Sequence, residues 1–345
     1  MRRALTLIAL TLFAAACAVA EPENPQSLRL LAHDSFAAGV SDDTFADFTD
    51  STGIEVEVIA GSDAGSMVNQ AVLSKDNPLA DVIFGVDDTF LSRAVDEGIL
   101  LEYESQLSDR VPEDLFRGAR GQVTPIDYGD VCINYAKEWF ETSGIPVPVT
   151  LDQLREPTYA DVLTVEHPAT SSPGLAFMLA TIALYGEEGW LDFWADLEAG
   201  GVGVVPDWDT AYYADFTPYG GTSAMVVSYA SSPPAEVIYA TEPIDEAPTG
   251  VIEAGCYRQV EYAGILDGTS YPDAAGQLID FMLSVEFQET IPLTWFVFPA
   301  NQDAELPAVF VEHTTLPESP AHLDPAVIAE NRDRWIDQWV SVMEG

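Results

Sequence analysis

Three strand–helix units follow one another in the first third of the chain, and this alternation constrains the fold more than any other feature. The expected strands cover residues 28–32, 54–59 and 80–84. The helices after them are expected to begin at the capping side chains Ser41, Asp63 and Asp88. A βαβαβα order predicts an α/β fold with a doubly wound parallel sheet. Ligands of such sheets bind beyond the carboxyl ends of the strands, where the helices begin, so we expect a binding site there.

Two later strands enclose a region with helices and strands of its own. These two strands are expected at 128–135 and 256–265. Inside the region, helices are expected at 174–185 and 187–199 and strands at 202–205 and 224–229, and two further helices follow it at 273–284 and 325–343. The order predicts two lobes joined by two crossing strands that form a hinge.

The lobe limits follow from the positions of the crossing strands. Lobe one is expected to hold residues 28–125 and 260–345. Lobe two, with the hinge strands, is expected to hold residues 126–259. Two sequential domains remain the alternative.

The first twenty residues have the pattern of an export signal. Arg2 and Arg3 precede an apolar run from Leu5 to Ala16. Cleavage after Ala18-Val19-Ala20 would remove residues 1–20 as a signal peptide. Alternatively, Cys17 follows three alanines in a string that resembles a lipobox, and its lipidation would anchor the protein to the membrane. In either case we expect an exported protein with a polar tether over residues 21–27.

Two cysteines remain after this segment, Cys132 and Cys256. An even pair in an exported chain predicts one disulfide, because the compartment is oxidising. Two buried free thiols are the alternative.

The chain carries 57 acidic and 13 basic residues, a formal net charge of −44. Nucleic acid and anionic lipid are therefore poor partners, whereas a cationic ligand is favoured. The acids are dispersed along the chain rather than gathered in a tail, as in proteins that stay hydrated in concentrated salt. A saline habitat is one interpretation, and solubility of an exported protein is the other.

Signals of catalysis are weak in the sequence. We find no GxSxG, HExxH, GxxxxGK[ST] or CxxC string. The four histidines, His33, His167, His313 and His322, lack the spacing of metal ligands. We therefore expect a binding protein, with no catalytic residue, no metal site and no cofactor.

Two kinds of segment are candidates for ligand binding. In Thr170–Leu175, Ser172 suits an N-cap and Pro173 the first helical position, and the N–H groups that follow can bind a hydroxyl or a phosphate. Asp63 begins a helix in the same way, and ordinary capping explains both segments equally well. The second kind is aromatic: Trp208, Tyr229, Trp295 and Phe296 lie in or beside loops. Such residues can enclose a flat cationic ring, or they can simply pack.

At these residues the chain resembles the thiamine-binding proteins of ABC importers. The similarity covers nearly all of the mature chain and includes HDSFAA at 33–38, ADVIFGVD at 80–87, DYG at 127–129, TSSPGL at 170–175, Trp208 with Ala211-Tyr212, SYASSP at 228–233 and PAN at 299–301. The resemblance implies the two-lobed periplasmic-binding-protein fold of type II with two hinge crossings. It also implies thiamine or a thiamine phosphate as ligand, and a membrane permease as partner of a monomeric protein.

The resemblance also implies the site residues. Trp208, Tyr229 and Phe296 would form an aromatic cage, with Trp295 as a substitute for Phe296; Asp34, Ser35 and Asp63 would contribute from lobe one; and Ser171 and Ser172 would face the hydroxyethyl or phosphate end of the ligand. The chain departs from the family pattern at His33, where other members carry an aromatic residue, at Phe296, where they carry Trp, and at Ala235, where they carry Tyr.

Three alternatives remain open. Ferric-iron receptors share the fold but bind the metal through paired tyrosines, and Tyr212-Tyr213 is the one adjacent pair in the sequence. Polyamines and other organic cations suit the same acidic and aromatic residues. A secreted thiaminase would need a reactive cysteine, which a bonded Cys132 or Cys256 cannot supply.

Overall fold

The computed structural model of the protein describes residues 25–345. The expected signal peptide, the lipidation at Cys17 and most of the tether lie outside the described residues. None of the helices within 25–345 is long and apolar enough to cross a membrane.

The first three strands pair as the alternation predicted. They are β1 (Ser27–Ala32), β2 (Glu55–Ala60) and β3 (Val82–Asp87). β1 pairs with both others in parallel, which gives the order β2-β1-β3. The connecting helices are α1 (Asp34–Gly39), α2 (Ala46–Thr52), α3 (Ala64–Leu73) and α4 (Leu91–Asp96). Asp63 caps α3 as expected, whereas α1 was not expected and α2 begins three residues after Asp43.

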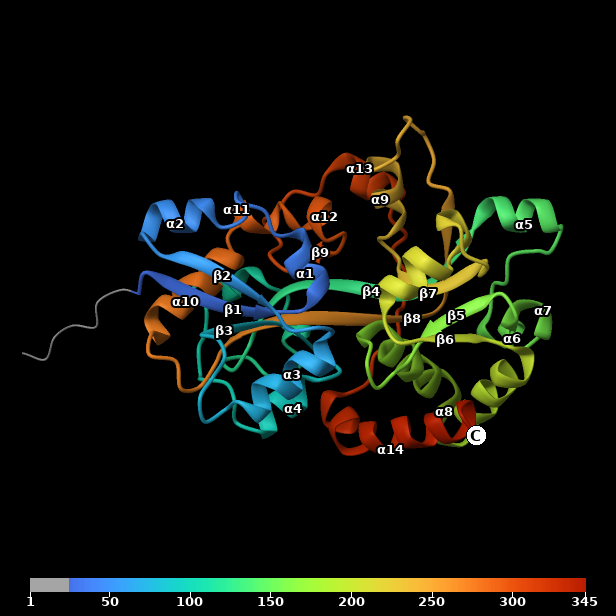
Figure 1. Ribbon diagram of the computed structural model, residues 1–345, viewed down its shortest axis with the longest axis horizontal. Helices are drawn as coiled ribbons and strands as arrows, with labels where there is room; N and C mark the ends of the chain where they lie inside the picture. The colour runs from blue at the N-terminus through green and yellow to red at the C-terminus, as the bar shows by residue number, and fades with distance from the viewer. Residues whose placement is uncertain (1–24) are drawn as a thin grey trace, which may run out of the picture.

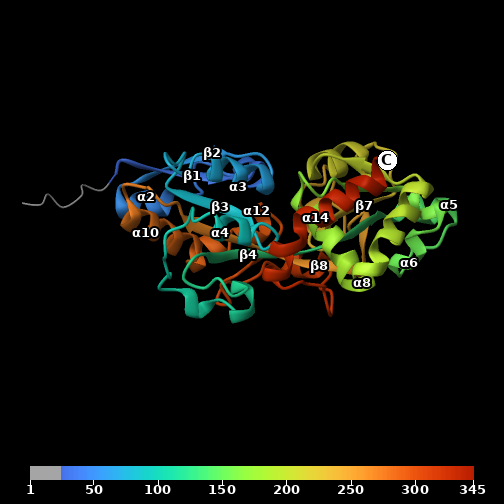
Figure 2. The same ribbon diagram turned by 90° about the horizontal axis from the view of Figure 1, so that it is seen from below.

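Two long antiparallel strands join the lobes (Figures 1 and 2). They are β4 (Thr124–Ala136) and β8 (Thr249–Ile265), and they pair along nearly their whole length. β8 also pairs with β3, so the sheet of the first lobe continues into the crossing strands. The predicted disulfide between Cys132 and Cys256 is confirmed, and it links these two strands.

The second lobe continues the sheet from β4. Its strands are β5 (Leu163–Glu166), β6 (Gly203–Val205) and β7 (Met225–Tyr229), in the order β4-β7-β5-β6. The long helix α8 (Ser172–Gly200) is interrupted at Gly186, whose φ is 68° and ψ 174°. The sequence predicted this break as two helices that meet at residue 186.

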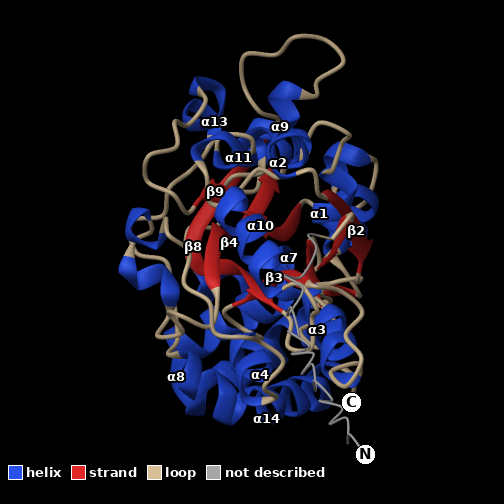
Figure 3. Ribbon diagram, turned by 90° about the vertical axis from the view of Figure 1, so that its left-hand side faces the viewer, coloured by secondary structure: helices blue, strands red, loops and turns tan. Residues whose placement is uncertain are grey.

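Shorter elements complete the lobes, with helices surrounding the strands (Figure 3). They are α5 (Lys137–Ser143), α6 (Leu151–Leu154), α7 (Pro157–Ala160), α9 (Pro233–Ile238), α10 (Pro272–Met282), α11 (Val285–Gln288), α12 (Ile291–Thr294), β9 (Phe298–Pro299) and α13 (Ala308–His313).

The C-terminal helix α14 (Pro325–Met343) has the limits predicted for it but a different place. We expected it in lobe one, yet it packs on α8 in the other lobe (Figure 2). Trp339 meets Trp194 of α8 edge to face at 5.4 Å, and the Trp335 indole N–H donates to Glu187 at 2.9 Å. The chain reaches this position by running beside β8, where Ala321 bridges to Tyr257. The apolar face of α14 therefore packs on α8, while the same helix also contacts α4 of lobe one, so α14 lies against both lobes.

Candidate functional site

The first turn of α8 faces lobe one. Ser171 takes the N-cap position, one residue earlier than the sequence predicted, and its side chain makes no capping hydrogen bond. The hydroxyls of Ser171 and Ser172 are buried, and neither makes a hydrogen bond of good geometry among the described residues, although the Ser172 side chain lies near enough to Asp87 to oppose the rise in its pKa. Buried hydroxyls are almost always hydrogen-bonded in native proteins, so these two groups indicate a missing polar partner.

Asp63 connects this turn to lobe one. Its Oδ1 atom accepts hydrogen bonds from the backbone N–H groups of Ala64 at 2.6 Å and of Ser172 at 3.3 Å. One carboxylate therefore contacts the starts of two helices, α3 and α8, in different lobes. Burial raises the pKa of Asp63 to about 6, although the nearby His33 opposes the rise.

Four more carboxyl groups gather around Asp63. Together with it they form what we call the carboxyl cluster: Asp63, Asp87, Asp127, Glu166 and Glu261. Asp87 ends β3, Glu166 ends β5, and Asp127 lies opposite Glu261 on the crossing strands. Burial raises the pKa of Asp87, Asp127 and Glu166, and neighbouring cluster members raise each of them further. Such a site gains free energy when a cation enters and restores ionised carboxylates.

His33 is the base that faces the cluster. Its Nε2 atom lies 3.3 Å from Glu261 Oε2, and its Nδ1 atom accepts a hydrogen bond from Phe36 N–H at 3.2 Å. Burial acts to lower the pKa of His33, but the charge and hydrogen bond of Glu261 together with the charges of Asp63 and Asp87 outweigh it, and the net pKa is raised. Across residues 25–345, no set of three or more His, Cys, Asp and Glu side chains is arranged to hold a metal ion.

Tyr229 links lobe two to the cluster through Gln259. The Tyr229 hydroxyl donates to Gln259 Oε1 at 3.0 Å, and the Gln259 amide donates to Asp87 Oδ2 at 2.8 Å. The Tyr229 ring lies over Gly129 of β4, where an added Cβ would come within 2.8 Å of the ring. Tyr229, one of the predicted site residues, therefore lies beside the carboxyl cluster. Gly129 leaves room for its ring because glycine has no side chain.

Trp208 lies in lobe two, where a neighbouring tyrosine packs against one face of its indole ring. It stacks on Tyr212 at a centroid distance of 5.0 Å, and its indole N–H donates to Ser228 Oγ at 2.9 Å. The next acid, Asp209, has a pKa raised by burial and then by the charges of Asp207 and Asp34. Asp34, which lies in lobe one, is therefore close enough to influence the pKa of Asp209 in lobe two.

The adjacent residues Trp295 and Phe296 have different surroundings. Trp295 stacks on Phe36 at 4.6 Å, and its indole N–H donates to the Phe36 carbonyl, which places it within the packing of lobe one. Phe296 has a φ of 57°, and its carbonyl accepts a hydrogen bond from Ser231 Oγ at 2.6 Å. The Phe296 ring meets Tyr239 edge to face at 5.8 Å. Phe296 therefore faces lobe two, and Trp295 does not take its place there.

The structure brings together part of the predicted set. Asp63 belongs to the carboxyl cluster, Ser171, Ser172 and Tyr229 lie beside it, and Trp208 and Phe296 lie on neighbouring segments. Asp34 and Ser35 are exposed on α1, where Asp34 accepts a hydrogen bond from Ser62 N–H at 2.9 Å. Five residues of this site were not predicted as site residues from the sequence: Asp87, Asp127, Glu166, Gln259 and Glu261. The position of Asp87 at the carboxyl end of β3 was the one signal that could have found it.

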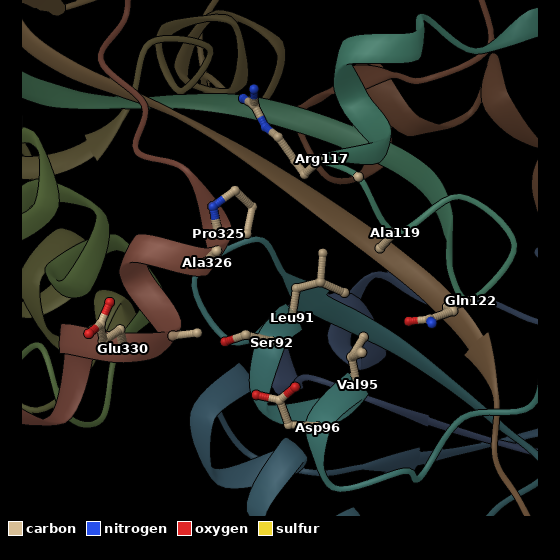
Figure 4. Close-up of a pocket in the computed structure, with 12 residues that line it drawn as sticks. Leu91, Ser92, Val95, Asp96, Arg117, Ala119, Gln122, Pro325, Ala326 and Glu330 are labelled. Carbon is tan, nitrogen blue, oxygen red and sulfur yellow. The ribbon is translucent and has the colours of Figure 1, made fainter.

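A separate cavity of about 580 Å³ lies between α4 and α14 (Figure 4). Leu91 and Val95 of α4 line it on one side, Ala326 and Glu330 of α14 on another, and Arg117 borders it. It shares no residue with the carboxyl cluster or with the predicted site residues.

Comparison with known proteins shows what this architecture resembles. The model of the family described as bacterial extracellular solute-binding protein matches residues 77–318. The thiamine-binding periplasmic protein of Brucella suis biovar 1 is 28% identical over 347 residues, covering 98% of both chains. That of Escherichia coli K12 is 28% identical over 318 residues, covering 90% of this chain and 92% of its own.

Solved structures agree on the fold. A periplasmic thiamin binding protein matches with a TM-score of 0.80 at 26% identity, over 92% of this chain and 96% of its own. Iron-bound HitA from Pseudomonas aeruginosa matches with a TM-score of 0.75 at 21% identity, over 92% and 99% of the two chains, which supports the fold alone. The predicted two-lobed periplasmic-binding-protein fold of type II is confirmed.

Proposed function

The chain belongs to the bacterial extracellular solute-binding proteins, and on that premise we propose that it captures thiamine outside the cytoplasm and delivers it to the permease of an ABC importer. Proteins of this family bind and hand over a solute rather than transform it. The names of the relatives, which are thiamine-binding periplasmic proteins, support the choice of ligand.

The carboxyl cluster is the observation that carries the proposal. Buried acids with raised pKa values, and buried hydroxyls without a hydrogen bond of good geometry, describe a site that is incomplete without a cationic, hydrogen-bonding ligand. Thiamine has a permanent positive charge on its flat thiazolium ring, beside which Tyr229 offers an aromatic side chain. Its hydroxyethyl group would supply a partner for Ser171 and Ser172.

Two alternatives are disfavoured by specific contacts. The buried Tyr212 hydroxyl donates to Glu236 at 2.6 Å, and the rings of Tyr212 and Tyr213 meet edge to face, so this pair does not present two hydroxyls to one ferric ion. A thiaminase nucleophile is not available at Cys132 or Cys256, because both are bonded in the disulfide.

Calorimetric titration with thiamine, spermidine and ferric citrate tests the proposal. We expect thiamine to bind with a Kd of about 1 μM or lower, equivalent to about −8 kcal/mol or tighter. Spermidine should bind at least tenfold more weakly, because it has no ring to place beside Tyr229. If millimolar thiamine gives no heat while spermidine or ferric iron binds tightly, thiamine is not the ligand and the proposal is wrong.

A further inference from the structure

Glu236 of α9 is a buried acid that lies outside the carboxyl cluster and has no part in the ligand contacts proposed above. Its side chain is buried, and both carboxyl oxygens accept hydrogen bonds. Oε1 accepts from the Tyr212 hydroxyl at 2.6 Å, and Oε2 accepts from the Thr249 hydroxyl at 2.7 Å. Short hydrogen bonds between hydroxyl and carboxyl groups are among the stronger ones in proteins. Glu236 therefore fixes the position of the Tyr212 side chain relative to α9 and to the start of β8.

The Tyr212 hydroxyl is the donor in this pair. Burial raises the pKa of Tyr212 well above its ordinary value, and the charge of Glu236 and the hydrogen bond to it raise it further. The hydroxyl therefore stays protonated at physiological pH. Burial also raises the pKa of Glu236, while the hydrogen bonds from Tyr212 and Thr249 oppose the rise. A carboxyl group keeps an acceptor oxygen in either protonation state, so the contact with Tyr212 does not depend on the charge of Glu236.

Tyr212 lies in a π-helical turn, Thr210–Asp215, that directly follows the Trp208 segment. Such turns are rare in proteins and are frequent at functional sites. The Tyr212 and Trp208 rings stack at a centroid distance of 5.0 Å and an interplanar angle of 19°. Tyr213 meets the Trp208 ring edge to face at 5.4 Å. Tyr212 therefore covers one face of the indole and fixes the plane in which the ring lies.

A second contact fixes the edge of the same indole. The Trp208 N–H group donates to Ser228 Oγ at 2.9 Å, and Ser228 Oγ lies 2.9 Å from Ser232 Oγ. Ser232 is the residue before α9, and Glu236 lies within that helix. The edge and one face of the Trp208 ring are therefore both positioned from α9, through Ser228 and through Tyr212.

The orientation of an aromatic ring decides whether it can bind a cation. The attraction acts over the face of the ring and requires the cation to lie within about 6 Å of its centre. A ring that is fixed before the ligand arrives also avoids the entropy cost of being ordered on binding. A residue that orients the Trp208 ring can thus contribute to affinity without any contact with the ligand.

From these contacts we infer that Glu236 is a positioning residue for ligand binding: through Tyr212 it orients the Trp208 ring, so that the face left uncovered by Tyr212 can meet the cationic ring of the ligand. The inference rests on the proposed function, since it concerns the capture of the same cation. It extends the site to an acid behind the aromatic residues.

Thiamine Kd values of the purified variants, measured by calorimetry, test the inference. Glu236→Ala should weaken binding about fivefold, as expected for the loss of one buried hydrogen bond. Tyr212→Phe, which keeps the ring and removes the hydroxyl, should weaken it to a similar extent. Glu236→Gln should restore most of the affinity, because its amide oxygen can accept from Tyr212 and its amide nitrogen can donate to Thr249. Glu242→Ala, at an exposed position after α9, is the control and should bind as the wild type does.

A double-mutant cycle separates positioning of the ring from general stabilisation of the lobe. If Glu236 acts through Trp208, Glu236→Ala should cause no further loss of affinity in a protein that already carries Trp208→Ala. A role in stability alone predicts a lower melting temperature with an unchanged Kd.

The outcomes distinguish this inference from the proposed function. If the wild type does not bind thiamine, the proposed function fails and the inference fails with it. If the wild type binds thiamine, three results would each refute the inference and leave the function standing: an unchanged Kd for Glu236→Ala, a Glu236→Gln variant as weak as Glu236→Ala, or an equal loss in the Trp208→Ala background. Should Glu236→Ala not fold, Tyr212→Phe alone and combined with Trp208→Ala decides in the same way.

Discussion

The Oδ1 atom of Asp63 lies 3.3 Å from the backbone nitrogen of Ser172 and joins the two lobes by a hydrogen bond. The same oxygen caps α3 through Ala64 N–H. A second contact between segments of opposite lobes, from Ser231 Oγ to the Phe296 carbonyl, lies at 2.6 Å. Asp63 therefore takes part both in the contact between the lobes and in the group of acids proposed to bind the ligand. We expect ligand binding and lobe closure to be coupled for this reason.

Asp63→Asn should weaken thiamine binding by tenfold or more, about 1.4 kcal/mol. The substitution removes a buried negative charge that a thiazolium cation would stabilise, while the asparagine oxygen can still cap α3. Isothermal titration calorimetry measures the change. Asp47→Asn, at an exposed position in the first turn of α2, is the control and should bind as the wild type does. Equal affinities for the two variants would remove Asp63 from the site.

The ligand-free protein should become more stable as the pH falls from 8 to 5. Burial raises the pKa of Asp63 to about 6 and that of Asp88 to about 7, from 3.8 for both in the unfolded chain. The folded protein therefore binds more protons than the unfolded chain in this range, and the free energy of unfolding rises as pH falls. Melting temperatures at constant ionic strength provide the measurement, and a steady decrease towards pH 5 would contradict the assignment of these buried acids.

Thiamine affinity should follow the opposite trend. A bound cation favours ionised carboxylates, so protons are released on binding, and protonation of Asp63 below about pH 6 opposes it. The Kd measured by calorimetry should accordingly increase as the pH is lowered from 7 to 5. A constant Kd over this interval would show that the cluster does not exchange protons with the ligand.

Trp208→Ala should weaken thiamine binding by tenfold or more if the ring contacts the cation, since an aromatic face contributes roughly 0.5–2 kcal/mol to such a contact. The ring also stacks on Tyr212, so simple packing predicts a lower melting temperature with unchanged affinity. Both quantities are measured on one sample. Trp208→Phe keeps an aromatic face but loses the hydrogen bond to Ser228, and it should retain most of the affinity.

Added NaCl should raise the melting temperature steadily. With a net charge of −44, repulsion among surface carboxylates destabilises the folded protein in dilute buffer, and salt screens it. Thermal scans between low and molar NaCl test this, with Na₂SO₄ at matched ionic strength as a control for the identity of the anion. A flat or falling curve would rule out adaptation to a saline habitat.

Several elements could be predicted because their signals are local. Asp63 caps α3 as its position before an apolar periodicity indicated, and α14 has its predicted limits. The place of α14 could not be predicted, because Trp335 and Trp339 show that a face is buried but not which helix buries it. Likewise, nothing in the sequence shows that the adjacent Trp295 and Phe296 have different surroundings. In the structure the backbone has a positive φ at Phe296, and the two side chains pack in different places.

The carboxyl cluster could not be predicted for a different reason. Among 57 acidic residues, no local pattern distinguishes those that become buried from those on the surface. Asp87, Glu166 and Glu261 lie on three different strands, and their approach depends on how the strands and lobes are assembled. The resemblance to a known family indicated the lobes and the cage residues but not the acids between them.

A crystal structure of the protein with thiamine tests the central claim most directly. The account predicts the ligand between the lobes, with its thiazolium ring beside Tyr229 and the carboxyl cluster and its hydroxyl group within hydrogen-bond distance of Ser171, Ser172 or Glu166. Thiamine bound elsewhere, for example in the cavity between α4 and α14, with the carboxyl cluster unchanged, would contradict it.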